Sequence, residues 1–496
     1  MSRLGPRSHA VIGVGRASAR PQTYRFWSRP TTITLRPFFD LRLATTMFGP
    51  LSKPIGSRHL SAADTYQQPT SYRGEVARGM TDFRTFTVIV YVKQGSEQTL
   101  RELLDRYGDV IQEADSAFRF SSSDTIHFAR WVLVDPLISG SQAGTRLVFS
   151  CHYDGPSEAL LEQVVRRDPR ALDSIYSHCV GYPLESERTE RTRAAYLGAN
   201  AVKVNAIFIG APDRTLVQIR EEARLREAIE AFLNTRDFSG KRPTEVLEAI
   251  RSSVFSDPAL ESVTRPAPPR AKTLLNVSLF GLAILFLLPA LAVWLFILRV
   301  CFERVEKPLN LMPSGLNPSL VKVLERREDI YVQNQFSQLM DVKPGRFRLL
   351  TLKGVLWSSN FLGRNLFKNG TINSIPSIHF YSWILLDGGK RLLFLSNFDG
   401  SWASYLGDFI DKAAFGLNAV LSNCAGFPVT WFLFFKGVTD VEHYKAWARN
   451  ANIATQAWYT GYPTLNVKNV NMNSKIRLGL LQTMDDPKAA DWLRLL

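Results

Sequence analysis

Two stretches of alternating apolar and polar residues, about 250 positions apart, share one pattern. Residues 126–135 read IHFARWVLVD and residues 378–387 read IHFYSWILLD. Aromatic and β-branched residues with a two-residue period predict strands. A second pair of segments follows, RLVFSCHYDG from 146 and RLLFLSNFDG from 391, and predicts further strands that end in Asp-Gly turns.

The similarity continues past these strands. Residues 146–183 align with residues 391–428 at a constant offset of 245, without a gap, and 11 of 38 positions are identical. The chain therefore contains an internal duplication, with one copy on each side of a long apolar segment.

Hydrophobic periodicity predicts the same element order in both copies. The first copy has strands at 85–93, 126–134, 146–153 and 202–209, with helices from Ser96 and over 157–180. The second has strands at 332–342, 378–386, 391–398 and 430–435, with helices over 344–367 and 402–421. A charged helix follows each copy, at 213–233 and 440–450. This β-α-β-β-α-β order predicts an α+β fold of two ferredoxin-like units joined through one hydrophobic membrane segment.

The pattern also suggests domain boundaries. They are 1–80 for a basic targeting segment and linker, 81–240 for the first unit, 241–272 for a linker, 273–300 for the membrane segment, 301–330 for a linker, 331–480 for the second unit and 481–496 for a tail.

Residues 273–298 contain no charge, and their 26 positions exceed the about 20 residues that span a bilayer as a helix. Basic residues flank both ends, so the positive-inside rule assigns no orientation. A single crossing would place the two copies on opposite sides of the membrane. A hairpin that turns at Pro289 would keep both on one side.

The formal net charge of +15 is concentrated at the N-terminus. Residues 1–62 hold ten Arg or Lys and one acid, Asp40, which leaves +6 for the rest of the chain. An Arg-rich, acid-poor start is typical of an organellar transit peptide, and we expect the mitochondrial inner membrane or another organellar membrane. A disordered basic tail, or initiation at Met47, would explain the same composition. No nucleic-acid partner is expected, and four cysteines are too few for a disulfide framework.

The candidate site residues lie on the duplicated strands. Strict alternation places His127 and Trp131 on one face, with His379 and Trp383 at the equivalent positions. That face is expected to line the space between two facing sheets. The next strand adds His152 and Asp154 in the first copy, and Asn397 and Asp399 in the second. Arg130 belongs to this face only if a bulge redirects it.

Two consecutive units of this kind resemble the dimeric α/β-barrel superfamily, which includes chlorite dismutases and dye-decolourising peroxidases. The chain also resembles uncharacterised membrane-anchored bacterial proteins with this strand pattern. Peroxidases of the former group carry a GxxDG motif, of which SCHYDG and LSNFDG keep the last two residues. The resemblance implies a haem-dependent, peroxidase-like oxidoreductase that takes peroxide as substrate. The strand faces, and not the resemblance, supply the candidate residues: His127 and His379 as haem ligands, and His127, Trp131, His152, Asp154, His379, Trp383 and Asp399 as catalytic residues.

A second interpretation gives these residues structural roles and assigns no reaction to the protein. Asp-Gly at a strand end is a common turn, in which Asp caps a helix and Gly supplies a positive φ. Half-buried His and Trp are commonly packing groups. The sequence has no Walker loop and no HExxH or GxSxG motif. The alternative is therefore a non-enzymatic membrane-surface protein that binds the lipid bilayer, a small apolar ligand or a protein partner.

Overall fold

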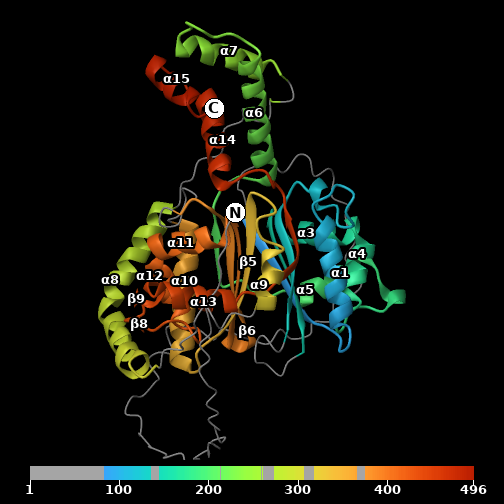
Figure 1. Ribbon diagram of the computed structural model, residues 1–496, viewed down its shortest axis with the longest axis vertical. Coiled ribbons are helices and arrows are strands. Elements are labelled where there is room, and N and C mark those ends of the chain that lie inside the picture. Colours follow the sequence, from blue (N-terminus) through green and yellow to red (C-terminus); the bar gives the residue numbers. More distant parts are fainter. Residues whose placement is uncertain are drawn as a thin grey trace, which may run out of the picture. The chain divides into compact units, whose positions relative to one another are not determined.

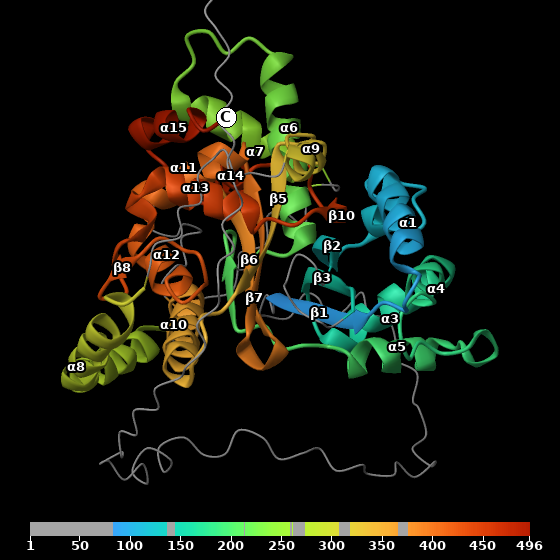
Figure 2. The same ribbon diagram turned by 60° about the horizontal axis from the view of Figure 1, so that its bottom comes forward.

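Two four-stranded antiparallel sheets form the centre of the fold, and helices cover their outer faces (Figures 1 and 2). The computed structural model describes residues 83–135, 144–212, 214–257, 260, 273–306, 318–365 and 375–496. All of them belong to one compact unit, Gly74–Leu496. The targeting segment expected at 1–80 lies outside the described residues.

The first sheet has the strand order β1-β3-β2-β10, and the second has the order β4-β6-β7-β5. The strands of the first are β1 (Phe83–Tyr91), β2 (Ile126–Val134), β3 (Arg146–Asp154) and β10 (Thr455–Thr460). Those of the second are β4 (Ala206–Ile209), β5 (Gln333–Asp341), β6 (Ile378–Leu386) and β7 (Arg391–Asp399). The expected α+β class with antiparallel sheets is confirmed.

Each sheet takes one strand from the other copy, which the sequence did not predict. Strand β4 pairs with β6, and β10 pairs with β2. Just before these strands, residues 200–202 bond to β1 and residues 451–453 bond to β5. The bonds run from Val202 N to Thr87 O at 2.8 Å and from Ile453 N to Ser337 O at 2.8 Å. The eight strands therefore form a closed circuit of backbone hydrogen bonds. The boundaries expected at 81–240 and 331–480 do not separate two independent units.

The strand expected at 430–435 is wrong. Those residues form only a short hairpin of β8 (Thr430–Trp431) and β9 (Phe435–Lys436). The fourth strand of the second copy is instead β10. A run of aromatic residues in the hairpin matches the residue types that favour strands, which explains the error.

The helices follow the predicted places with a few additions. In the first copy they are α1 (Glu97–Val110), α3 (Ser157–Arg167), α4 (Pro169–Tyr176), α5 (Glu190–Ala199), α6 (Leu216–Asn234) and α7 (Pro243–Phe255). Between the copies lies α8 (Thr273–Ile297), which continues as a π-helical turn over 298–303. The second copy has α9 (Pro318–Glu325), α10 (Arg346–Asn365), α11 (Trp402–Lys412), α12 (Ala414–Leu421), α13 (Val441–Asn450), α14 (Val467–Leu480) and α15 (Asp486–Leu493).

Helices α6 and α7 pack against α14 and α15 (Figure 1). Their shared core includes Leu225, Ile250, Ile476 and Trp492. Helix α7 therefore occupies part of the expected linker 241–272, and α15 occupies the expected tail 481–496. Likewise, α9 lies within the expected linker 301–330.

The expected topologies of the apolar segment conflict with the fold. Strand β4 precedes α8 in the chain and β6 follows it, and the two are hydrogen-bonded neighbours. A single crossing with the copies on opposite sides of a membrane would separate these strands. The hairpin is also wrong, because α8 continues as one helix through Pro289.

Candidate functional site

A β-bulge sets the direction of the side chains on β2 and on β6. The strand registers shift between Ile126 and Phe128, and between Ile378 and Phe380. An extra residue at a bulge places two successive side chains on the same side and reverses the alternation beyond it. His127 and Phe128 therefore both face the space between the sheets.

The bulge also corrects the prediction for the two tryptophans. Trp131 lies in the core between the first sheet and its helices, with its ring centroid 4.6 Å from that of Phe149. Trp383 lies in the corresponding core of the second sheet, 4.1 Å from Phe394. Neither lines the space between the sheets. Arg130 does line the space between the sheets, because the bulge redirects its side chain.

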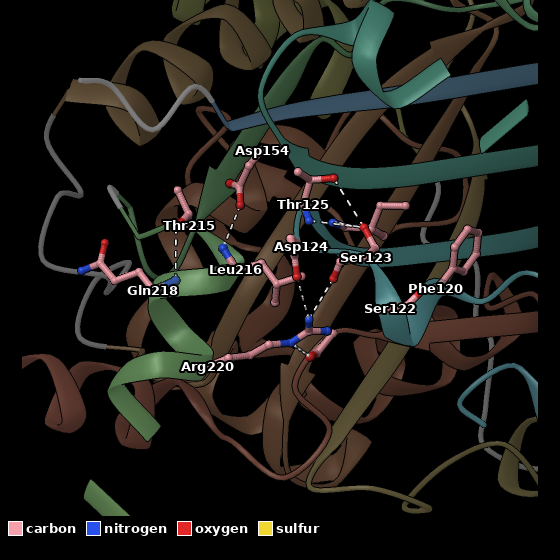
Figure 3. Close-up of polar contacts among 12 residues, drawn as sticks. Phe120, Ser122, Ser123, Asp124, Thr125, Asp154, Thr215, Leu216, Gln218 and Arg220 are labelled. Carbon is pink, nitrogen blue, oxygen red and sulfur yellow. Dashed lines mark hydrogen bonds and ion pairs between the residues drawn. The ribbon is translucent and has the colours of Figure 1, made fainter. Parts of the chain in front are cut away.

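Asp154 links His127 to the start of α6, and Figure 3 shows its bond to Leu216 there. His127 Nε2 lies 2.9 Å from Asp154 Oδ1, although outside the angles of a hydrogen bond. The other carboxylate oxygen, Oδ2, accepts the backbone N–H of Leu216 at 2.7 Å. The following Gly155 has φ +93°, as an Asp-Gly turn requires. The carboxylate therefore caps α6, and not the next helix in the chain, α3.

The second copy repeats this arrangement. His379 Nε2 donates to Asp399 Oδ1 at 2.7 Å, and Asp399 Oδ2 accepts the N–H of Val467 at the start of α14 at 2.8 Å. The hydroxyl of Tyr462 lies 3.3 Å from His379 Nδ1. Both imidazoles are buried, as is Tyr462. A buried histidine beside the aspartate of the Asp-Gly turn is thus present in both copies.

A polar network crosses between the two sheets. Arg130 donates to Phe336 O at 3.0 Å and Ser396 O at 2.7 Å, and it contacts Asn397 Oδ1. At the equivalent place across the fold, His152 Nε2 lies 3.0 Å from Ser382 Oγ. The duplication therefore brings Arg130 to Asn397 on one side and Ser382 to His152 on the other.

Burial governs the charges in this network. It lowers the pKa of Arg130 to about 9, so the guanidinium stays charged near neutral pH. Burial, followed by the charges of Arg130 and His127, holds the pKa of His152 well below its usual value. Burial likewise raises the pKa of Tyr462 well above its usual value. The network holds one permanent cation bound to neutral acceptors, which is a structural arrangement.

The predicted haem site does not fit these residues. Aromatic rings pack directly on both imidazoles: Phe83 and Phe380 are each 5.3 Å from His127, and Phe128 is 5.5 Å from His379. The space between Phe83, His152 and Phe380 does not admit a water molecule. Each Nε2 also faces a carboxylate oxygen. A macrocycle would have to displace this core, so no step through haem is derived. Among the described residues, no group of three or more His, Cys, Asp or Glu is arranged to hold a metal ion.

Helix α8 presents a different kind of surface. It lies along α10, which separates it from the strands of the second sheet (Figures 1 and 2). Trp294 Nε1 donates to Thr351 Oγ1 at 2.9 Å and its ring stacks 4.1 Å from Phe347. One helical stretch of the described chain, Val277–Glu303, is long and apolar enough to cross a membrane, and only 6% of its most apolar window is buried.

The outer side of α8 exposes large apolar side chains along most of its length. Phe286 is 82% exposed. The other exposed large side chains of this helix are Leu279, Leu282, Leu285, Leu287, Leu288, Leu291, Val293, Phe296 and Ile297. Exposed aromatic residues Trp357 on α10 and Trp431, Phe432 and Phe435 on the β8–β9 hairpin belong to the elements beside it. The hairpin was not predicted from the sequence, although the aromatic run TWFLFFK could have indicated it.

In comparisons with known proteins, no family model, curated protein or solved structure matches this chain.

Proposed function

We propose that this chain is a monotopic membrane-surface protein that inserts α8 lengthwise into one leaflet. The observation that carries the proposal is that α8 packs along α10 on one side and exposes a continuous set of large apolar side chains from Leu279 to Ile297 on the other. Exposed apolar patches of this extent mark interaction surfaces.

A lipid bilayer fits this surface better than an aqueous partner groove. The exposed side chains are mostly Leu, Val, Ile and Phe with no charge from 273 to 298. The rim carries Trp357 and Trp431 together with the cations Lys353 and Lys436, and all four side chains are exposed. Tryptophan and lysine at the edge of an apolar surface are typical of the membrane interface.

Strand exchange supports a one-sided location. Elements before and after α8 share both sheets, so both copies lie on the same side of the membrane. The Arg-rich start fits an organellar membrane, which we propose to be the mitochondrial inner membrane. The repeated element order and the closed strand circuit favour ferredoxin-like units of the dimeric α/β-barrel type. We propose a structural role without catalysis for the space between the sheets, because side chains fill it.

The test is flotation of the full-length protein with preformed phosphatidylcholine vesicles. We expect the wild type to float and Phe286→Asp to lose at least tenfold in vesicle affinity, since a charge in hydrocarbon costs about 2.5–3.5 kcal/mol. The matched control is Leu184→Asp, an exposed apolar side chain of the first copy, which should float as the wild type does. Equal binding by both variants, or no binding by the wild type, would refute the proposal.

Protease protection tests the one-sided arrangement. When the protein is added outside sealed vesicles, trypsin should cleave sites in both copies. Cleavage confined to one copy would show that α8 crosses the bilayer.

A further inference from the structure

A cavity of about 780 Å³ lies where α8 ends against the second copy. Its lining includes Arg299 and Arg304 from the last turns of the apolar helix, and Trp431, Lys436 and His443 from the hairpin and α13. The cavity therefore lies at one end of the surface that we propose to be embedded in lipid.

The carboxylates around this cavity are already engaged. Glu303 is buried and accepts the Thr430 hydroxyl at 2.8 Å and two backbone N–H groups of the hairpin, those of Phe432 at 2.7 Å and Leu433 at 2.8 Å. Glu306 pairs with Lys343 at 2.8 Å and with Arg348. These contacts hold the hairpin against the end of α8.

The acid that faces the cavity from the other side is also paired. Asp440 lies 2.7 Å from His443 Nδ1. Among the residues that the structure describes, no carboxylate of the lining therefore remains to neutralise a further cation by a close ion pair.

Two cations of the lining remain available for an anion. In the described part of the chain, neither Arg304 nor Lys436 has a carboxylate within ion-pair distance, and Arg299 lies 3.8 Å from the engaged Glu303. The Lys436 ammonium lies 3.6 Å from the centre of the Trp431 ring, and the Arg299 guanidinium lies 5.3 Å from it. Lys343 and Arg348 are not part of the lining, but they neutralise Glu306, so Arg304 and Lys436 keep charges that no close carboxylate of the lining compensates.

The duplication provides an internal comparison. The first copy joins its Gly-Tyr-Pro turn to α5 through residues 184–189, which include Glu185 and Glu187. The second copy has residues 429–440 at this place, six more, and they carry the aromatic and basic hairpin. The hairpin is therefore present only in the copy that packs against α8.

We propose that this cavity binds the phosphate of an anionic phospholipid, with Arg304 and Lys436 as its principal contacts. The inference rests on the proposed membrane function and names the lipid class. Trp431, which lines the cavity, is 44% exposed and its neighbour Phe432 is 41% exposed, and exposed aromatic rings suit the level of the lipid headgroups. Surface cations of this kind favour anionic lipid. A lipid supplies both the phosphate for the cavity and the acyl chains for α8.

The test compares flotation of full-length protein with phosphatidylcholine vesicles and with vesicles that also contain phosphatidylglycerol. We expect the wild type to prefer the anionic vesicles by roughly tenfold or more. The double variant Arg304→Gln/Lys436→Gln should lose this preference but keep its affinity for phosphatidylcholine. The control Arg346→Gln/Lys390→Gln removes the same charge from exposed positions outside the cavity lining and the rim, and it should keep most of the preference.

The outcomes separate the two proposals. A wild type that binds neither vesicle refutes the membrane function, whereas equal binding to both vesicles refutes only the headgroup site. Equal losses in the two double variants would show diffuse attraction and overturn the site. Inorganic phosphate provides the last arm: if it abolishes the preference at micromolar concentration, the cavity is a site for free phosphate and the lipid assignment is wrong.

Discussion

Asp154 and Asp399 each contact a histidine with one carboxylate oxygen and a helix N-terminus with the other. Each aspartate is the last residue of a strand of its own copy, β3 or β7. The helix that it caps, α6 or α14, comes after the exchanged strand β4 or β10, which lies in the other sheet. A charge-assisted hydrogen bond to a backbone N–H contributes about 1.5–3 kcal/mol. These two residues therefore stabilise the positions of the exchanged strands β4 and β10 at the point where the chain leaves each sheet.

We expect Asp399→Ala to lower the free energy of unfolding by about 2–4 kcal/mol, because it removes a helix cap and leaves the buried His379 without its partner. Asp485→Ala is the matched control, since Asp485 caps α15 with no histidine beside it, and its loss should cost about 1 kcal/mol. Urea denaturation monitored by tryptophan fluorescence measures both. Equal losses in the two variants would mean that the His379 contact contributes nothing to stability.

The sequence allowed part of this site to be predicted. Alternation along β3 and β7 correctly placed His152, Asp154, Asn397 and Asp399 between the sheets. It failed for Trp131 and Trp383, because one extra residue in a bulge reverses every later side chain of the strand. The backbone N–H group that each aspartate binds could not be predicted either, because Leu216 and Val467 are 62 and 68 residues away along the chain.

Among the secondary-structure elements, the turns after β4 and β10 are tightly constrained. Gly210 N donates to His379 O at 2.6 Å, and Gly461 N donates to His127 O at 2.7 Å. A β-carbon on Gly210 would lie 1.9 Å from Ile378 O, and one on Gly461 would lie 2.8 Å from Ile126 O. Both exchanged strands thus end against the bulge of the strand with which they pair.

Gly210→Ala should therefore lower the free energy of unfolding by about 3 kcal/mol or more, and Gly461→Ala by about 1–3 kcal/mol, because backbone must move to admit the methyl group. Gly407→Ala lies within α11 with no heavy atom near its β-carbon, and it should add about 0.5–1 kcal/mol. Thermal unfolding followed by circular dichroism ranks the three variants. A Gly210→Ala protein as stable as the wild type would rule out the close approach.

Most single elements were predictable and their partners were not. The predicted strands at 378–386 and 391–398 agree with β6 and β7 to within one residue. However, the pairing of β4 with β6 joins positions more than 170 residues apart, and no local period encodes it. The aromatic run at 431–435 resembles a strand, because the lipid-facing surface that we propose and the interior of a sheet favour the same residue types.

For the whole molecule, the exchange of β4 and β10 makes the two copies interdependent. The first sheet without β10 would expose the edge of β2, and the second without β4 would expose the edge of β6. Unpaired edges of buried strands favour aggregation. The bundle of α6, α7, α14 and α15 adds a second shared core, so neither copy can bury its apolar surface by itself.

We therefore expect residues 74–260 and residues 273–496 to be insoluble or unfolded when each is expressed separately, and to form a soluble one-to-one complex when expressed together. The cut removes only residues 261–272, and both sheets and the shared helix bundle can then assemble between the two fragments. Co-purification through a tag on one fragment and far-ultraviolet circular dichroism of the complex measure the outcome, with detergent present for α8. The matched variant carries Gly210→Ala in the first fragment, and it should reduce recovery of the complex because β4 can no longer approach β6. If residues 74–260 fold cooperatively without the second fragment, each copy is an independent domain and the exchange of strands is wrong.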